Sequence, residues 1–166
     1  MAFDRIFQGQ PSTIAAGNTP LYAALGVDTV DSTLYISAGN GWVPATGTAG
    51  AASLTAQTAN NANVLTFTAQ AAGMYLVSLY EVSTNTPTGA TLPAITVVYT
   101  DAASNTSVTD TLADVTSVSA AGVVNQGTFR VSVAAGGTIV VATTSYAAGS
   151  GTALAYAVSA RVSYLG

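Results

Sequence analysis

The sequence predicts an all-β protein built as an antiparallel β-sandwich, and three observations support this prediction. Short segments in which apolar and polar residues alternate follow one another over the later two-thirds of the 166-residue chain, a pattern typical of strands that bury one face. Turn signals containing Gly, Pro and Asn separate these segments. No segment shows the apolar period of a helix, because Gly, Thr and Asn interrupt the alanine-rich stretches. Many short strands with turns between them favour a sandwich.

The first part of the chain differs in composition from the rest. Residues 1–44 hold three of the five prolines, the only tryptophan and four of the ten charged residues. We therefore divide the chain into an N-terminal arm or hairpin, residues 1–50, and a sandwich domain, residues 51–166. An ordered arm, a small separate domain and extra strands of the sandwich are all compatible with the N-terminal part. Residues 45–63, which are mostly Ala, Thr, Gly, Ser and Asn, are either a linker or a weakly patterned first strand.

Eight strands are predicted in the sandwich domain from alternation and β-branched content. They cover residues 64–68, 74–81, 94–100, 108–112, 115–118, 127–133, 138–144 and 152–165. Residues 86–89, Thr-Pro-Thr-Gly, predict a turn before the third of them. The loop 134–137, Ala-Ala-Gly-Gly, predicts the clearest hairpin of the chain, between the sixth and seventh strands.

The last predicted strand has two unlike faces. One face carries Leu154, Tyr156, Val158, Ala160, Val162 and Tyr164, and the other carries Ala155, Ala157, Ser159, Arg161, Ser163 and Leu165. We expect the bulky face to meet the core. The face of small residues would let another backbone or subunit approach closely.

The composition is unusually poor in charge. Only 6% of residues are charged, 49% are hydrophobic, and the formal net charge is −4, whereas soluble domains carry roughly 25% charged residues. Part of the uncharged surface is therefore expected to lie against other subunits. With three arginines as the only cations, no basic stripe exists for nucleic acid. No apolar run approaches the ~20 residues of a membrane span, and the first residues lack an apolar signal segment, so we expect synthesis in a cytoplasm.

Residue types for enzyme chemistry are scarce. The chain has no His, Cys or Lys, so most general-base and nucleophilic schemes lack a participant, and we predict neither enzyme activity nor a cofactor. Asp101, Asp110 and Asp114 could converge as paired carboxylates, but roles in turns and at sheet edges explain them more simply. Calcium takes only oxygen ligands, which makes Asp28, Asp31 and Asp101 weak candidates; none lies in an ordered calcium loop, and no metal is predicted.

Two arginines lie in otherwise apolar strands. If Arg130 or Arg161 is buried, we expect Glu81 or one of the three aspartates above to bond to it, because a buried guanidinium requires a partner. The alternative is that both arginines point to solvent.

Three segments resemble the jelly-roll domains of the C1q and tumour-necrosis-factor superfamily. Residues 73–78, Gly-Met-Tyr-Leu-Val-Ser, are similar to its G-x-Y-x-V strand, residues 131–141 resemble its penultimate hairpin, and the Gly/Ser loop 147–151 precedes a terminal strand. The resemblance implies a C1q/TNF-like jelly roll that forms a homotrimer, in which the sheet that holds the terminal strand and the G-x-Y-x-V strand faces the threefold axis. For the core and the trimer interface it implies Tyr75, Val77, Tyr156, Val158 and Tyr164.

A second likeness concerns the N-terminal part. Residues 31–43, DSTLYISAGNGWV, are similar to the short "LY…G.GW" hairpin of many phage tail-fibre and virion proteins. Leu34, Tyr35 and Ile36 would form its first strand, residues 38–41 its turn, and Trp42 a large anchor on the return. The candidates for docking on a particle are Phe3, Phe7, Leu34, Tyr35 and Trp42.

These features together favour a non-enzymatic virion component, a homotrimeric decoration or head-fibre protein whose partners are its own copies and other virion proteins such as the major capsid protein. The first alternative is a tail-associated module that binds a glycan or another host-surface molecule through Tyr and Trp42. The second is a bacterial surface adhesin or pilus-like subunit, which would need a signal peptide and a strand for donor exchange.

Overall fold

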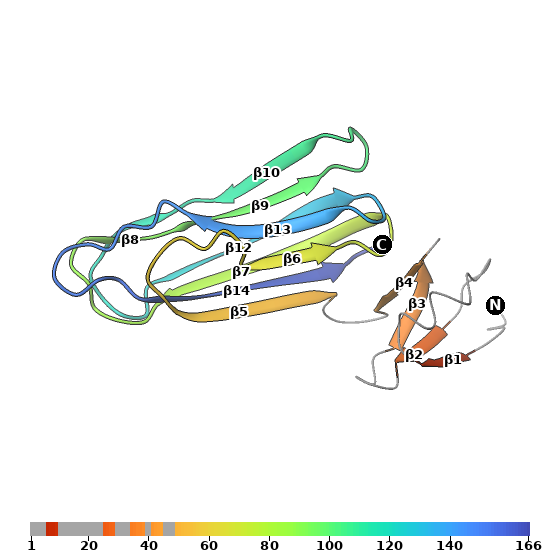
Figure 1. The fold of residues 1–166 in the computed structure, drawn as a ribbon, viewed down its shortest axis with the longest axis horizontal. Coiled ribbons are helices and arrows are strands. Elements are labelled where there is room, and N and C mark those ends of the chain that lie inside the picture. The colour runs from red at the N-terminus through yellow and green to blue at the C-terminus, as the bar shows by residue number, and fades with distance from the viewer. Residues whose placement is uncertain (1–5, 10–24, 29–33, 39–40, 45–48) are drawn as a thin grey trace.

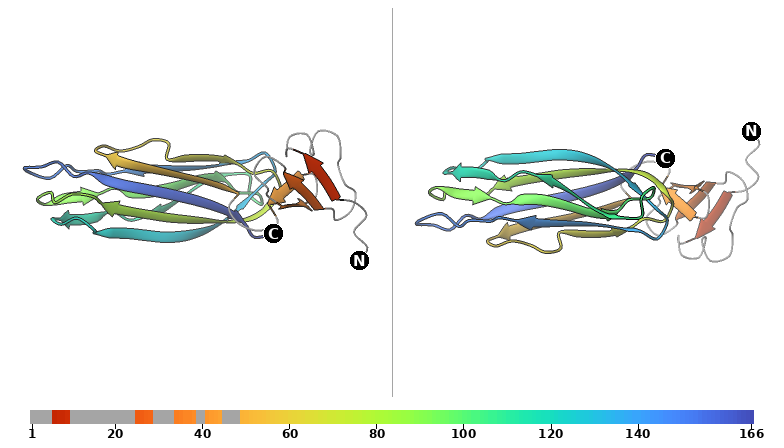
Figure 2. Two further views of the ribbon diagram at one scale, coloured as in Figure 1. Left: turned by 90° about the horizontal axis from the view of Figure 1, so that it is seen from below. Right: turned by 90° about the horizontal axis from the view of Figure 1, so that it is seen from above.

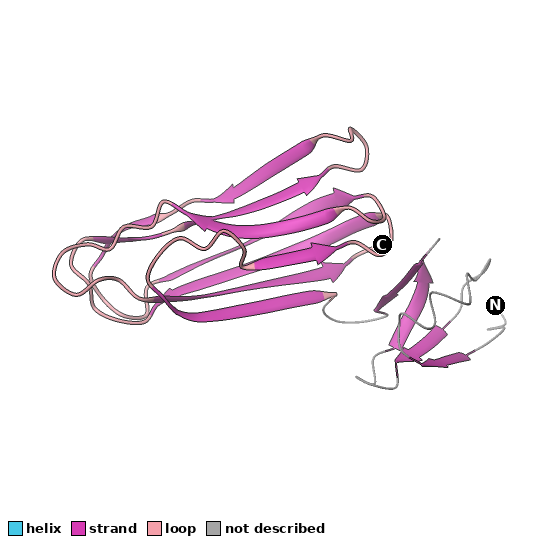
Figure 3. Cartoon of the chain, viewed as in Figure 1, coloured by secondary structure: helices cyan, strands magenta, loops and turns pink. Residues whose placement is uncertain are grey.

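The computed structural model describes residues 6–9, 25–28, 34–38, 41–44 and 49–166. Within these residues all regular structure is β-strand, as Figure 3 shows, which confirms the predicted all-β class. The described part contains no helix long and apolar enough to cross a membrane.

Residues 49–166 form two facing sheets, with strands that run along the long axis in Figures 1 and 2. Sheet I has the order β12-β7-β14-β5, and sheet II has the order β10-β9-β13-β6. The strands of sheet I are β12 (Val124–Val133), β7 (Gly73–Ser83), β14 (Tyr156–Tyr164) and β5 (Gly50–Gln57). Those of sheet II are β10 (Ser107–Leu112), β9 (Ala94–Thr100), β13 (Thr138–Thr144) and β6 (Leu65–Thr68). A short antiparallel pair, β8 (Ala90–Leu92) with β11 (Val115–Val118), completes the domain.

The core lies between the two sheets because each long strand alternates apolar and polar residues. In β7 every second side chain from Tyr75 to Ser83 is buried, and β9, β13 and β14 show the same alternation. All pairings within sheets I and II are antiparallel. An antiparallel sheet with one face on the core and one on the surface gives this pattern, so the predicted sandwich is confirmed.

The predicted hairpin across residues 134–137 is wrong. β12 pairs with β7 in sheet I, whereas β13 pairs with β9 and β6 in sheet II. The loop therefore crosses from one sheet to the other. The physical reason is that both strands carry fully buried apolar residues, such as Val131 and Ile139, and strands in facing sheets can both point such residues into one core.

The stretch 45–63, which the sequence left open as a linker or a first strand, contains a strand at residues 50–57. They form β5, which pairs with β14, and the Ala49 N–H donates to the Val162 carbonyl over 2.7 Å. Small side chains such as Ala51 and Ser53 have no strong preference for strands. Pairing with β14 therefore stabilises this strand.

The N-terminal strands form a sheet of their own, with the order β1-β2-β3-β4. They are β1 (Ile6–Gly9), β2 (Leu25–Asp28), β3 (Leu34–Ala38) and β4 (Gly41–Pro44). β3 and β4 pair antiparallel, as the predicted hairpin requires, and Ser37 lies opposite Trp42. β1 and β2 pair in parallel, which the sequence did not indicate.

Candidate self-association surface

Over β14 and β5, the outward face of sheet I consists mainly of Ala and Ser side chains. Register places Tyr80 of β7 opposite Ser159 of β14, and Ser159 opposite Ser53 of β5. The next row runs from Ser78 through Arg161 to Ala51. Small side chains thus cover β14 and β5, and a second backbone could come close to the sheet there.

A shallow depression lies on this face, with a volume of about 550 Å³. Its lining residues come from β5, β7 and β14, and they are Ala51, Ala52, Ser53, Ser78, Leu79, Tyr80, Ser159, Ala160 and Arg161. Tyr80 is the largest of these side chains and Arg161 the only charged one. The depression therefore offers a small-residue floor, one aromatic ring and one cation.

Three of the four large exposed hydrophobic side chains of the described residues lie on the same face. Met74 and Tyr80 of β7 are 37% and 41% exposed, and Val124 of β12 is 44% exposed. They alternate along their strands with buried residues, so they point away from the core. They are spread along the face, from Met74 near the start of β7 to Val124 opposite Val82 near its end.

Both sandwich arginines are exposed, so the expected buried ion pair is wrong. Arg130 lies opposite Leu76 on the β12–β7 pair, and Arg161 lies opposite Ser78 on the β14–β7 pair. Both belong to the outward set of sheet I because their strand neighbours, Val131 and Val162, are fully buried. They add positive charge to an otherwise uncharged face.

The three sandwich aspartates do not form one site. Among the described residues no group of three or more acidic side chains is close enough to hold a metal ion. Asp101 Oδ1 accepts hydrogen bonds from the Ala103 N–H (3.1 Å), the Ser104 N–H (2.8 Å) and the Ser104 hydroxyl (2.8 Å). These bonds lower the pKa of Asp101. Its carboxylate therefore closes its own turn.

Four of the five residues proposed for the core and trimer interface are core residues. Tyr75, Val77, Tyr156 and Val158 are at most 1% exposed in the single chain, so they offer no surface to a second copy. The family resemblance selected them by strand, and within β7 and β14 they occupy the inward positions of the alternation. The outward residues between them, such as Tyr80 and Ser159, are the ones that line the surface.

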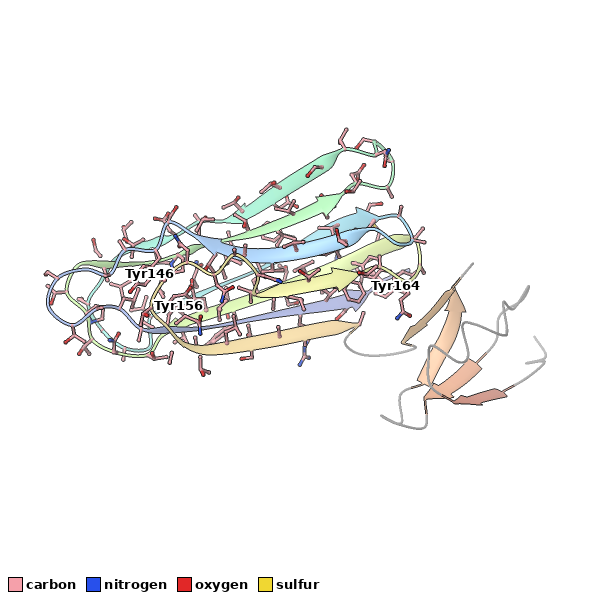
Figure 4. The ribbon with its side chains drawn as sticks, viewed as in Figure 1. Tyr146, Tyr156 and Tyr164 are labelled. Carbon is pink, nitrogen blue, oxygen red and sulfur yellow. The ribbon has the colours of Figure 1, made fainter. Side chains whose placement is uncertain are left out.

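Tyr164, the fifth candidate, packs at the end of the sandwich near the C-terminus (Figure 4). Its ring lies 5.1 Å from that of Tyr75, and its hydroxyl donates to the Ala72 carbonyl over 3.2 Å. A Cβ on Gly73 would come within 2.8 Å of this ring. Glycine at position 73 therefore makes room for Tyr164.

A buried polar group inside the sandwich was not anticipated from the sequence. Glu81 is fully buried, and neither of its carboxyl oxygens has a hydrogen-bond partner among the described residues. Burial raises its pKa to about 8, and the nearby Asn125 side chain offsets part of that rise. Glu81 occupies a core position in the alternation of β7, which is the one sequence signal that could have revealed its burial.

Five of the remaining candidates lie in the N-terminal strands. Phe7 lies in β1, Asp28 ends β2, Leu34 and Tyr35 lie in β3, and Trp42 lies in β4. Phe3 and Asp31 lie outside the described residues. The predictions that these residues dock on a particle or bind calcium stay predictions.

Comparison with known proteins gives a likeness to a solved structure. No protein-family model matches the chain. No curated protein sequence matches it either. Among solved structures, the globular domain of zebrafish complement 1qA protein matches over 70% of this chain and 97% of that chain, with 12% sequence identity and a TM-score of 0.46.

Proposed function

We propose that this chain is a non-enzymatic structural subunit of a bacteriophage particle, a capsid decoration or head-fibre protein that works as a homotrimer. The observation that carries the proposal is the outward face of sheet I, where Tyr80 stands exposed beside a floor of Ala and Ser and where Met74 and Val124 are also exposed. Burying such a face against identical copies stabilises an assembly by roughly 25 cal/mol per Å² of apolar surface. A threefold assembly would also match a local symmetry axis of a shell.

The phage origin rests on the sequence. The N-terminal hairpin pattern around Trp42 and the neutral surface, rich in Thr, Ala and Gly, support it, and the β3–β4 pairing is compatible with that hairpin. The N-terminal sheet would face the particle, and the sandwich would carry the self-association.

The first test measures the mass of the assembly in solution. Size-exclusion chromatography with light scattering should give three times the chain mass of 16.4 kDa. Ser159→Trp should reduce the mass to that of one chain, because a large ring would fill the depression. Thr138→Trp is the matched control, since Thr138 is an exposed residue of β13 in sheet II. A wild-type protein that stays monomeric at high concentration would overturn the proposed homotrimer.

The second test locates the protein on particles. Gold-labelled antibody and electron microscopy of purified virions should show many copies on the head. Labelling of only a few copies at the tail tip would replace decoration by receptor recognition, and absence of label would reject a virion role.

One observation favours the receptor-binding alternative as a second candidate. Tyr80, Arg161 and the serine hydroxyls of the depression offer stacking, a cation and hydrogen bonds, which is the chemistry that holds an acidic sugar. Glycan-array binding that is lost in Arg161→Gln, with the assembly mass unchanged, would support this candidate.

A further inference from the structure

A buried acid of sheet I lies between two residues that hold the same loop. Glu81 is fully buried, and neither of its carboxyl oxygens has a hydrogen-bond partner among the described residues. Asn125 lies directly opposite it on β12, and Ser83 lies two positions further along the inward face of β7. Both neighbours form hydrogen bonds with residues 113–123, the segment between β10 and β12 that includes β11. We call residues 113–123 the strap.

Hydrogen bonds to these two neighbours hold both ends of the strap. At its start, the Asn125 side-chain amide donates to the Ala113 carbonyl over 2.8 Å. At its end, the Ser83 hydroxyl donates to the Ala120 carbonyl over 2.8 Å and accepts from the Val123 N–H over 2.9 Å. Each of these bonds ends on a residue beside the buried acid, so the closure of the strap and the surroundings of the acid are linked.

The middle of the strap is weakly held. Its strand β11 pairs with the three-residue β8 in a sheet of two strands, and the register shifts between Val115 and Val118. Ser117, inside this irregularity, has a φ of +61°, a region that disfavours residues with a Cβ. Val118 is the one buried side chain of the strap. Exposed backbone with few buried apolar contacts opens at a lower free energy than the core does.

Opening of the strap removes the cost of a charge on Glu81. In the closed form an ionised carboxylate would have no hydrogen-bond partner, because the Asn125 amide opposite it is engaged by the Ala113 carbonyl, so the acid is held neutral. In the open form the Asn125 amide is free to turn to the carboxylate, and water reaches it. Loss of the proton therefore favours the open form.

The ionisable neighbours of Glu81 in the interior are tyrosines. The Glu81 charge contributes to the raised pKa of Tyr156 on β14, of which burial is the largest cause. Burial likewise raises the pKa of Tyr75, Tyr99 and Tyr146 above the ordinary value of 10.0, so all four rings stay neutral when Glu81 ionises. β8 and β13 carry no ionisable side chain. The charged groups of the other elements are Arg130 of β12 and Arg161 of β14, which are exposed, Asp110 of β10, which is half-buried beside Tyr99, and Asp114 of the strap, which is exposed.

We propose that Glu81 operates the strap as a pH-sensitive latch: residues 113–123 stay closed while Glu81 holds its proton and open when the proton is lost. This inference concerns the interior of one chain, so it does not depend on the proposed self-association. The open form exposes Val118 and leaves β8 without its partner strand, so an apolar surface becomes available as the pH rises.

The direction of the pH effect follows from two pKa values of Glu81. Burial raises the pKa of Glu81 to about 8 in the closed form, against an ordinary value of 4.5 that the open form approaches. Between these values the ratio of open to closed strap should rise by up to about tenfold per pH unit. Below pH 4.5 the strap is fully held, and above pH 8 the ratio no longer changes.

Amide hydrogen exchange measured by NMR tests the latch. The Gly122 N–H donates to the Ser83 carbonyl over 2.8 Å, so its protection reports whether the strap is closed. After correction for the intrinsic exchange rate, this protection in the wild type should fall by up to about tenfold per unit from pH 6 to pH 8. In Glu81→Gln it should stay constant. The amides of β9, an inner strand of sheet II, should be better protected than Gly122 at every pH.

Two further variants serve as controls. Ser83→Ala removes the bonds between the Ser83 hydroxyl and the strap, so it should lower the protection of Gly122 at every pH and leave its pH slope unchanged. Asp114→Asn removes an exposed acid of the strap and should leave both the protection and the slope unchanged. Circular dichroism checks that each variant folds.

Three results would overturn the inference. Protection of Gly122 that is constant with pH in the wild type would show that proton loss does not open the strap. A slope that survives in Glu81→Gln would assign the effect to another group. Equal protection of Gly122 and the β9 amides would mean that exchange occurs through global unfolding, with no separate opening of the strap. None of these results changes the mass of the assembly, which tests the proposed function separately.

Discussion

The carboxyl group of Glu81 lies directly across the β7–β12 pair from Asn125, whose side-chain amide donates to the Ala113 carbonyl over 2.8 Å. That amide is thus engaged by backbone, and both oxygens of Glu81 remain without a hydrogen bond among the described residues. Because no cation lies on the inward face of sheet I, the acid is most stable there in its neutral form. The fold therefore holds a proton that the unfolded chain would release.

The buried acid makes stability depend on pH. The folded chain keeps the proton up to about pH 8, whereas the ordinary pKa of the group is 4.5. Between these values the folded state binds more protons, so the free energy of unfolding should fall as pH rises, by up to about 1.4 kcal/mol per pH unit. Below pH 4.5 the contribution is fully present. Above pH 8 it is lost.

Glu81→Gln tests this dependence. Glutamine keeps the shape of the neutral acid and has no proton to lose, so at pH 7 the variant should avoid a cost on the order of 3 kcal/mol. Urea unfolding at pH 5, 7 and 9 measures the effect. Asp114→Asn, at an exposed acid, is the control and should leave the wild-type slope in place. A Gln variant with that same slope would show that Glu81 is not the responsible group.

The second prediction concerns a buried tyrosine at the far end of the sandwich from Tyr164 (Figure 4). The Tyr156 hydroxyl donates to the Ala59 carbonyl over 2.8 Å and lies 3.0 Å from Thr143 Oγ1. Tyr156→Phe should lower the free energy of unfolding by about 1–3 kcal/mol, because the Ala59 carbonyl and the Thr143 hydroxyl lose a hydrogen-bond partner. Thermal unfolding measures the loss. Tyr80→Phe, at an exposed ring, should change stability by less than about 0.5 kcal/mol; equal effects would argue against the network.

The local sequence pattern predicted most sandwich strands, because a strand that buries one face has apolar and polar residues at alternate positions. Residues 94–100, for example, are strand β9 as predicted. Pairing partners are not local, and here the prediction was wrong for residues 127–144, where a short loop with Gly suggested a hairpin but joins two sheets. The short strand β8 was missed, since Ala90–Leu92 is too brief to show a period.

The sequence predicted one side of the candidate surface. The small residues beside Arg161 in the last strand suggested close approach of another subunit, and of that face Ser159 and Arg161 line the depression. Tyr80 could not be assigned to the same surface, because its position opposite Ser159 depends on a register between strands about eighty residues apart. Glu81 could not be recognised as unpartnered, since that follows from what surrounds it in three dimensions.

The third prediction tests the packing around β8. Leu92 is fully buried in the core, so Leu92→Ala should cost about 2–5 kcal/mol through lost burial and a residual cavity. Leu165 is 51% exposed, and Leu165→Ala should cost less than about 0.5 kcal/mol. Urea unfolding compares the two with the wild type. Similar losses for both would mean that β8 does not seal the core as described.

The last prediction compares two glycines in one loop. Gly149 and Gly151 have φ values of +77° and +75°, a region that costs residues with a Cβ roughly 1 kcal/mol or more. At Gly149 a Cβ would also lie 2.6 Å from the Thr88 carbonyl oxygen, where the Ser150 N–H donates over 2.8 Å, whereas at Gly151 it would meet nothing within 4 Å. Gly149→Ala should therefore lower the thermal midpoint by several degrees more than Gly151→Ala, because backbone in the Thr88 segment must move. Equal shifts would show that backbone conformation alone sets the cost and that the loop does not press against Thr88.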